Sequence, residues 1–174
     1  MEVHMDNDDR NKDLFAGAMS SFMKNKLGIS LDLLNEIIDT DPDDKLALLA
    51  RGSVYLKMGN TENAIGDFSR TLQIDSSHPR AYHLRGLARE MAGDDDEALE
   101  DLNKAIEIDS EYGAAYYSRA TLLTKMGRED SALEDMKIVS QLSNHNIESF
   151  ANENNVWRSR HLQMETMMES EMQR

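Results

Sequence analysis

Residues 45–78 read KLALLARGSVYLKMGNTENAIGDFSRTLQIDSSH, and the two 34-residue segments that follow align with them without a gap. Residues 79–112 read PRAYHLRGLAREMAGDDDEALEDLNKAIEIDSEY, and residues 113–146 read GAAYYSRATLLTKMGREDSALEDMKIVSQLSNHN. The same residue types recur at fixed positions in all three segments, too densely for chance. A constant period of this length indicates a protein built by stacking one supersecondary unit.

Small residues occupy two positions of every segment. They are Gly52, Gly86 and Ala120 at position 8, and Ala64, Ala98 and Ala132 at position 20. Two antiparallel helices approach closely only where their side chains are small. Each segment is therefore predicted to be a hairpin of two helices that touch at these positions.

Two further positions fit the same hairpin. Position 15 is always glycine, at Gly59, Gly93 and Gly127, and position 24 is large and apolar, at Phe68, Leu102 and Met136. Glycine just after a helix supplies the positive φ that ends it. The large residue is expected to insert between neighbouring hairpins.

An arginine and an aspartate also recur together. Position 7 holds Arg51, Arg85 and Arg119, and position 23 holds Asp67, Asp101 and Asp135. The pattern allows a repeated ion pair that joins helices, or a row of arginines for an acidic ligand. Because the two residues recur as a pair, the pattern favours the structural interpretation.

These features closely resemble the tetratricopeptide repeat (TPR) family. The resemblance rests on the small residues at positions 8 and 20, Tyr55 at position 11 and the large apolar residue at position 24. It departs from the family where position 32 lacks proline and position 4 lacks tryptophan. The resemblance implies an all-α, right-handed superhelix of antiparallel helix hairpins with a C-terminal capping helix. It also implies a protein-binding role without catalysis.

The segments on either side are interpreted from the same register. Residues 11–44 place Leu14, Ala18, Leu34 and Pro42 at positions 4, 8, 24 and 32, and are predicted to be a divergent first repeat, although Ser21, Asn25 and Ser30 depart from the pattern. Residues 1–10 are expected to be a polar tail. Residues 147–174 are expected to form the capping helix and a Met-rich tail, anchored by Trp157, because the ends of repeat arrays are commonly atypical.

The net charge of −14 limits the choice of partners. An average field of this sign repels nucleic acid and anionic membranes. It either keeps the protein soluble or favours a basic partner. No stretch approaches the ~20 apolar residues of a membrane span, and the polar first residues do not resemble a secretory signal. The chain is therefore expected in the cytoplasm.

No motif for catalysis, metal binding or cofactor binding is found. The sequence lacks cysteine, a P-loop, G-x-S-x-G and H-E-x-x-H. Asp39, Asp41 and Asp43 imitate the start of an EF-hand, but Asp44 stands where glycine is required. The five histidines show no ligand spacing on one helix face. We predict a protein that is not an enzyme and has no cofactor or metal.

The resemblance implies a concave groove lined by positions 2, 5, 9, 12 and 13 of the first helices. The residues predicted to contact a partner there are Phe15, Met19, Phe22, Leu49, Ser53, Leu56, Arg80, His83, Leu87, Met91, Tyr117, Thr121 and Lys125. Its N-terminal half is apolar, which suits an extended peptide or an amphipathic helix. His83 is expected either to contact the partner or to be an ordinary solvated side chain.

Some TPR co-chaperones hold a partner's C-terminal carboxylate with a set of Lys, Asn and Arg residues. The corresponding positions here hold Phe15, Met19, Ala50, Arg80 and Leu84 in one register, and Leu49, Ser53, Leu84, Ala114 and Ser118 in the other. Neither set forms such a clamp. The alternatives to a general adaptor are a secretion-type chaperone that shields an apolar partner and a scaffold that self-assembles through its C-terminal tail.

Overall fold

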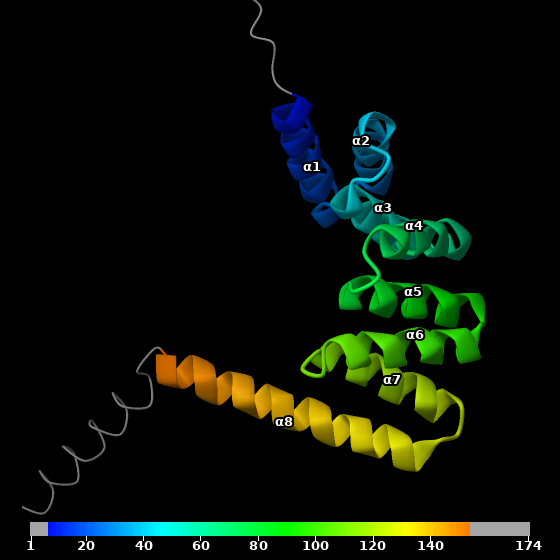
Figure 1. Ribbon diagram of the computed structural model, residues 1–174, viewed down its shortest axis with the longest axis vertical. Helices are drawn as coiled ribbons and strands as arrows, with labels where there is room; N and C mark the ends of the chain where they lie inside the picture. The colour runs from blue at the N-terminus through cyan, green and yellow to red at the C-terminus, as the bar shows by residue number, and fades with distance from the viewer. Residues whose placement is uncertain (1–6, 154–174) are drawn as a thin grey trace, which may run out of the picture.

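The computed structural model describes the backbone of residues 7–153 and the side chains of residues 7–143. Within this part the chain forms eight helices and no strand (Figure 1). They are α1 (Asn7–Met23), α2 (Leu27–Thr40), α3 (Lys45–Lys57), α4 (Thr61–Ile74), α5 (Pro79–Ala92), α6 (Asp95–Ile108), α7 (Gly113–Lys125) and α8 (Glu129–Glu153). The first helix begins at Asn7, inside the segment expected to be a polar tail.

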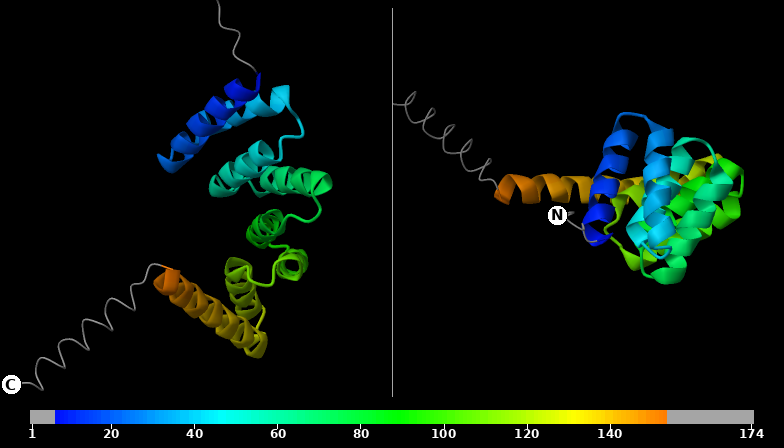
Figure 2. Two further views of the ribbon diagram at one scale, coloured as in Figure 1. Left: turned by 60° about the vertical axis from the view of Figure 1, so that its left-hand side comes forward. Right: turned by 90° about the horizontal axis from the view of Figure 1, so that it is seen from above.

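The helices pair in chain order into stacked hairpins, which confirms the predicted all-α superhelix. Each first helix also contacts the next first helix: α1 contacts α3, α3 contacts α5, and α5 contacts α7. No such contact joins the second helices α2, α4, α6 and α8 within the described residues. The stack therefore curves toward its first helices, which line the inner face of the arc in Figure 2.

The small residues allow the close hairpin contacts that the sequence predicts. A Cβ atom added to Gly52 would lie 2.6 Å from the Phe68 ring, and one added to Gly86 would lie 3.2 Å from the backbone oxygen of Ala98. The large residues at position 24 fill the core, because Leu34, Phe68 and Leu102 are all 0% exposed. In the last hairpin Met136 is 42% exposed, since no further hairpin within residues 7–153 covers it.

The first hairpin keeps the repeat geometry despite its unusual residues. Asn25 replaces the glycine of position 15 and takes the same left-handed conformation, with φ of 58° against 78° for Gly59. Asparagine tolerates this region better than most residues. The buried Ser30 replaces the alanine of position 20, and its hydroxyl donates to the carbonyl of Ala18 at 2.9 Å.

The ends of the second helices explain where one prediction is wrong. Asp41, Asp75 and Asp109 end α2, α4 and α6, and each carboxylate accepts the backbone N–H two residues further on. Such a turn competes with continued helix. Ser143 holds the corresponding place in the last repeat, and α8 continues without a break to Glu153.

Contrary to the expectation of a separate capping helix from residue 147, no new helix starts between residues 147 and 153, the last that the structure describes. The second helix of the last repeat and the beginning of the expected capping helix are one helix, which extends past the stack in Figure 1. Trp157 and the methionines of the predicted tail lie outside the described residues.

The recurring arginines and aspartates form the predicted ion pairs. Arg51 donates to both carboxylate oxygens of Asp67, at 2.9 and 2.7 Å, and the other two repeats reproduce this bidentate geometry within 0.1 Å. The remaining guanidinium nitrogen reaches back to the preceding hairpin, where it bonds Asn35, Ser69 or Asn103. Each arginine thus joins its own hairpin to the one before, which confirms the structural interpretation.

Candidate functional site

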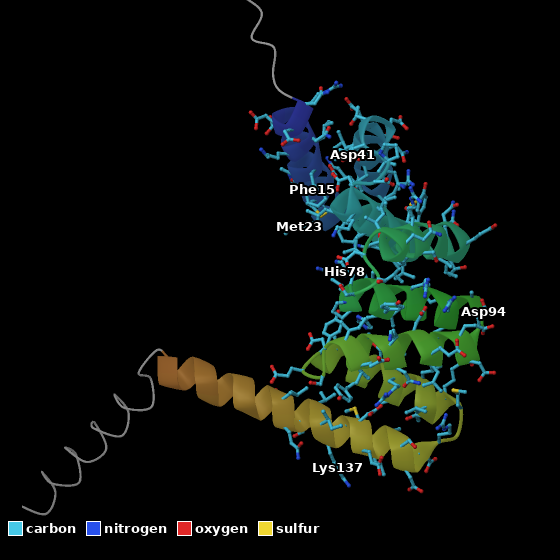
Figure 3. The ribbon with its side chains drawn as sticks, in the orientation of Figure 1. Phe15, Met23, Asp41, His78, Asp94 and Lys137 are labelled. Atoms are coloured by element: carbon cyan, nitrogen blue, oxygen red, sulfur yellow. The ribbon has the colours of Figure 1, made fainter. Side chains whose placement is uncertain are left out.

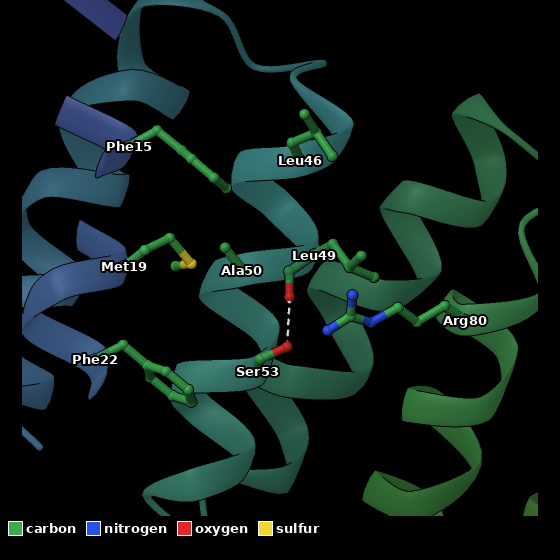
Figure 4. Close-up of a pocket in the computed structure, with 8 residues that line it drawn as sticks. All are labelled: Phe15, Met19, Phe22, Leu46, Leu49, Ala50, Ser53 and Arg80. Carbon is green, nitrogen blue, oxygen red and sulfur yellow. Dashed lines mark hydrogen bonds between the residues drawn. The ribbon is translucent and has the colours of Figure 1, made fainter. Parts of the chain in front are cut away.

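An open hollow lies between α1, α3 and α5 on the inner face of the stack (Figure 4). Its volume is about 160 Å³. It is lined by Phe15, Met19, Phe22, Leu46, Leu49, Ala50, Ser53 and Arg80. Six of these belong to the set predicted from the sequence. Leu46 stands at position 2 of its repeat, which the groove rule places on this face, although it was not among the predicted contacts. Ala50 was not expected there.

Helical spacing brings these residues together. Phe15, Met19 and Phe22 follow one another at intervals of four and three residues, so they share one face of α1. Leu46, Ala50 and Ser53 repeat the pattern on α3, and the side chains of the two helices face each other in Figure 4. Leu46 is 63% exposed, so its apolar surface at the hollow is open to solvent.

Arg80 supplies the charge at the edge of the hollow. It is the second residue of α5, a helix that begins after His78 accepts the N–H of Ala81 and Pro79 fixes the first turn. Figure 4 shows its guanidinium directed toward Ser53 and Leu49. The Ser53 hydroxyl already donates to the carbonyl of Leu49 at 2.8 Å.

His83 is not the solvated side chain or groove contact that the sequence analysis expected. It is 8% exposed, because the next first helix, α7, covers it. One ring nitrogen lies 2.8 Å from the Ser118 hydroxyl and the other 3.0 Å from the Tyr112 hydroxyl, whose ring meets the imidazole edge-on. His83 therefore joins the second and third full repeats.

The burial of His83 predicts a loss of stability in acid. Burial, followed by the nearby Arg80 charge, lowers the pKa of His83 below its ordinary value. The unfolded chain then binds this proton more readily than the folded one, so stability is complete above about pH 6.5 and falls below it. In urea titrations at pH 7.5 and 5.5, the free energy of unfolding should fall less in His83→Gln than in wild type. An equal fall would contradict this role.

The other predicted contacts do not join the hollow. Leu56 packs against the core cluster around Phe68, and Leu87 is half-buried. Met91 and Tyr117 are exposed. The Thr121 hydroxyl donates to the carbonyl of Ser118, and Lys125 pairs with Asp95 at 2.6 Å. Among the described residues, the concave apolar hollow therefore takes up the N-terminal half of the predicted groove.

A second exposed apolar region lies on α8, the helix on which Figure 3 labels Lys137. Leu133 is 60% exposed and Met136 lies one turn away. Within the described residues no three His, Asp or Glu side chains gather as metal ligands would. No helix in this part of the chain is long and apolar enough to cross a membrane.

Comparisons with known proteins agree with this architecture. Residues 44–111 match the tetratricopeptide repeat family. Among solved structures, a MamA fragment from Desulfovibrio magneticus RS-1 is 18% identical with a TM-score of 0.72, over 78% of this chain and 76% of that one. The first TPR of Spaghetti (RPAP3), bound to the HSP90 peptide SRMEEVD, is 21% identical with a TM-score of 0.66, over 72% and 99%. No curated protein matches the chain.

Proposed function

Because this chain is a tetratricopeptide repeat protein, we propose that it binds a peptide or an amphipathic helix of another protein in the hollow between α1, α3 and α5. The observation that carries this proposal is the lining of the hollow, where apolar side chains from two successive first helices face each other across an open space. Monomers rarely leave such a patch uncovered without a use.

The energetics of the hollow fit a side chain as its occupant. Burying one Leu, Phe or Met side chain contributes about 1.5–3 kcal/mol, and a helix offers such residues at i, i+3 and i+4. The peptide bound to the similar RPAP3 domain supports peptide binding as a use of this fold. The positions of a carboxylate clamp differ here, so recognition is proposed to depend on the apolar lining instead.

Two leucines with nearly equal exposure provide the test. Leu46 lines the hollow and is 63% exposed, whereas Leu133 lies on α8 and is 60% exposed. Both variants, Leu46→Glu and Leu133→Glu, should fold, because neither side chain is in the core. We expect Leu46→Glu to weaken binding of peptides selected from a random display library more than tenfold, as measured by fluorescence anisotropy. Leu133→Glu should leave the affinity unchanged.

The reverse pattern would place the binding site on α8. If no peptide is enriched on wild type relative to Leu46→Glu, the proposed function fails. Met19→Glu serves as a second variant on α1, so that the result does not depend on one helix. Circular dichroism of each variant checks that the helices remain folded.

Self-association is the second candidate function, and the exposed Leu133 and Met136 favour it. A second copy of the chain covering this face would bury Met136, whose counterparts Phe68 and Leu102 are covered by the next hairpin. The variant Leu133→Glu then becomes the test variant, and sedimentation would show a smaller species than wild type. The predicted absence of catalysis, the location in the cytoplasm and an oligomer formed through the C-terminal tail remain predictions.

A further inference from the structure

We propose that the outer face of α8 pairs with the same face of a second copy of this chain, antiparallel about a two-fold axis, and that Asp130 of each copy forms an ion pair with Lys137 of the other. The inference rests on self-association, the second candidate function, because it gives that function its geometry. Peptide binding in the hollow does not depend on it, since α8 contributes no residue to the hollow.

The outer face of α8 exposes apolar side chains at positions that earlier repeats cover. Leu133 stands at position 21, where Ile65 and Leu99 pack in clusters with residues of the next hairpin. Leu133 is 60% exposed and Met136 is 42% exposed, because no hairpin within residues 7–153 follows α8. Apolar side chains exposed together at the end of a stack mark an interaction surface.

Two opposite charges flank these apolar side chains. Asp130 and Lys137 are both exposed and stand seven residues apart, so they lie on one side of α8 with Leu133 between them; Lys137 is labelled in Figure 3. Neither forms an ion pair among the described side chains, whereas Asp135 on the inner side of α8 pairs with Arg119. The face therefore offers both signs of charge to a partner.

One alignment of two antiparallel helices satisfies both features. When Leu133 packs against Met136 of the second copy, Asp130 lies one turn before Leu133, and Lys137 of the second copy lies just after Met136, so the two charges meet at the edge of the apolar contact. The two-fold axis makes every contact twice. A parallel pair would instead set Asp130 against Asp130 and Lys137 against Lys137, which repel each other.

The two ends of the stack do not fit each other, which favours α8 as the partner of α8. Within the stack, the arginine at position 7 of each full repeat donates to an Asn or Ser at position 25 of the repeat before. At the ends of the stack, Gly17 replaces this arginine and Lys137 replaces the acceptor. Asp13 also stands at position 3, where the full repeats have an alanine that is 0% exposed. Stacking α1 on α8 of another copy would bury the Asp13 carboxylate without this hydrogen bond.

The test exchanges charges between chains. Sedimentation velocity of the full chain over a range of concentrations should show a reversible dimer for wild type. Asp130→Lys alone and Lys137→Glu alone each set like charges against each other twice per dimer, and should weaken dimerisation about tenfold or more. An equimolar mixture of the two variants should regain the wild-type affinity, because the mixed dimer forms one native and one reversed ion pair. The difference between the single variants and the mixture should shrink in 1 M salt.

Two exposed residues of the first hairpin provide matched controls. Lys24→Glu and Asp32→Lys change the net charge by the same amounts at the other end of the stack. Each control variant, and their mixture, should dimerise as wild type does.

The outcomes separate this pairing from self-association itself. If Leu133→Glu abolishes the dimer but neither charge variant weakens it, the antiparallel pairing is wrong and self-association through α8 stands. A loss in both charge variants without recovery in the mixture also overturns the pairing. A wild type that sediments as a monomer at every concentration, as it would if residues 154–174 of the same chain covered this face, rejects the second candidate function.

Discussion

A leucine at position 52 should lower the free energy of unfolding by about 3 kcal/mol or more, in a chain whose hairpins depend on close helix contact. Even a Cβ atom there would lie 2.6 Å from the Phe68 ring. That ring is 0% exposed and belongs to a buried cluster that includes Ala81 and Ala88 of the next hairpin, so a shift of the ring disturbs this packing. Urea unfolding followed by circular dichroism measures the effect.

The control for this prediction lies in the same hairpin. Gly66 is on the exposed side of α4, and a Cβ atom added there meets nothing within 4 Å. Gly66→Leu should therefore stabilise the protein by up to about 1 kcal/mol, since glycine is a poor helix former. Combining Gly52→Leu with Phe68→Ala should cost less than the sum of the two single changes, because the contact couples them. Additive losses would refute the packing described at this position.

The stacked hairpins could be predicted from the sequence because each close contact requires a particular residue type. Glycine or alanine at positions 8 and 20 and glycine at position 15 are constraints that each of the three full repeats meets separately, while Asn25 and Ser30 replace two of them in the first hairpin. The length of α8 was missed because it depends on one residue, Ser143, where three earlier repeats have aspartate. That aspartate was visible in the alignment, but its side-chain turn was not recognised as what ends the helix.

The site was harder to predict, because a position in a repeat does not determine how the next repeat covers it. Position 5 holds Leu49, His83 and Tyr117 in successive full repeats. The first two are buried against the following first helix, while Tyr117 is 53% exposed at the end of the stack. The hollow exists where α1 and α3 leave space between large apolar side chains. How these side chains pack is not determined by the repeat pattern alone.

The second large effect is expected at Asp101, because this carboxylate compensates two arginines. Arg85 donates to both of its oxygens and Arg89 donates to one, at 2.8 Å, while the Asp101 side chain is only 4% exposed. Asp101→Asn keeps the shape but leaves two guanidinium groups without their counter-charge. We expect the free energy of unfolding to fall by about 2–3 kcal/mol, less than for a fully buried pair because both arginines are partly exposed.

The repeat itself supplies the matched controls for Asp101. Asp67 and Asp135 hold the same position, and among the described side chains each pairs with a single arginine, Arg51 or Arg119. The same substitution at those sites should therefore cost about 1–2 kcal/mol, so that Asp101→Asn is the most damaging of the three. The double variant Asp101→Asn with Arg89→Gln should recover part of the loss, because it removes the second unpaired charge. Equal losses at all three positions would show that Arg89 adds nothing to the pair, and that the bidentate contact shared by the three full repeats accounts for the whole effect.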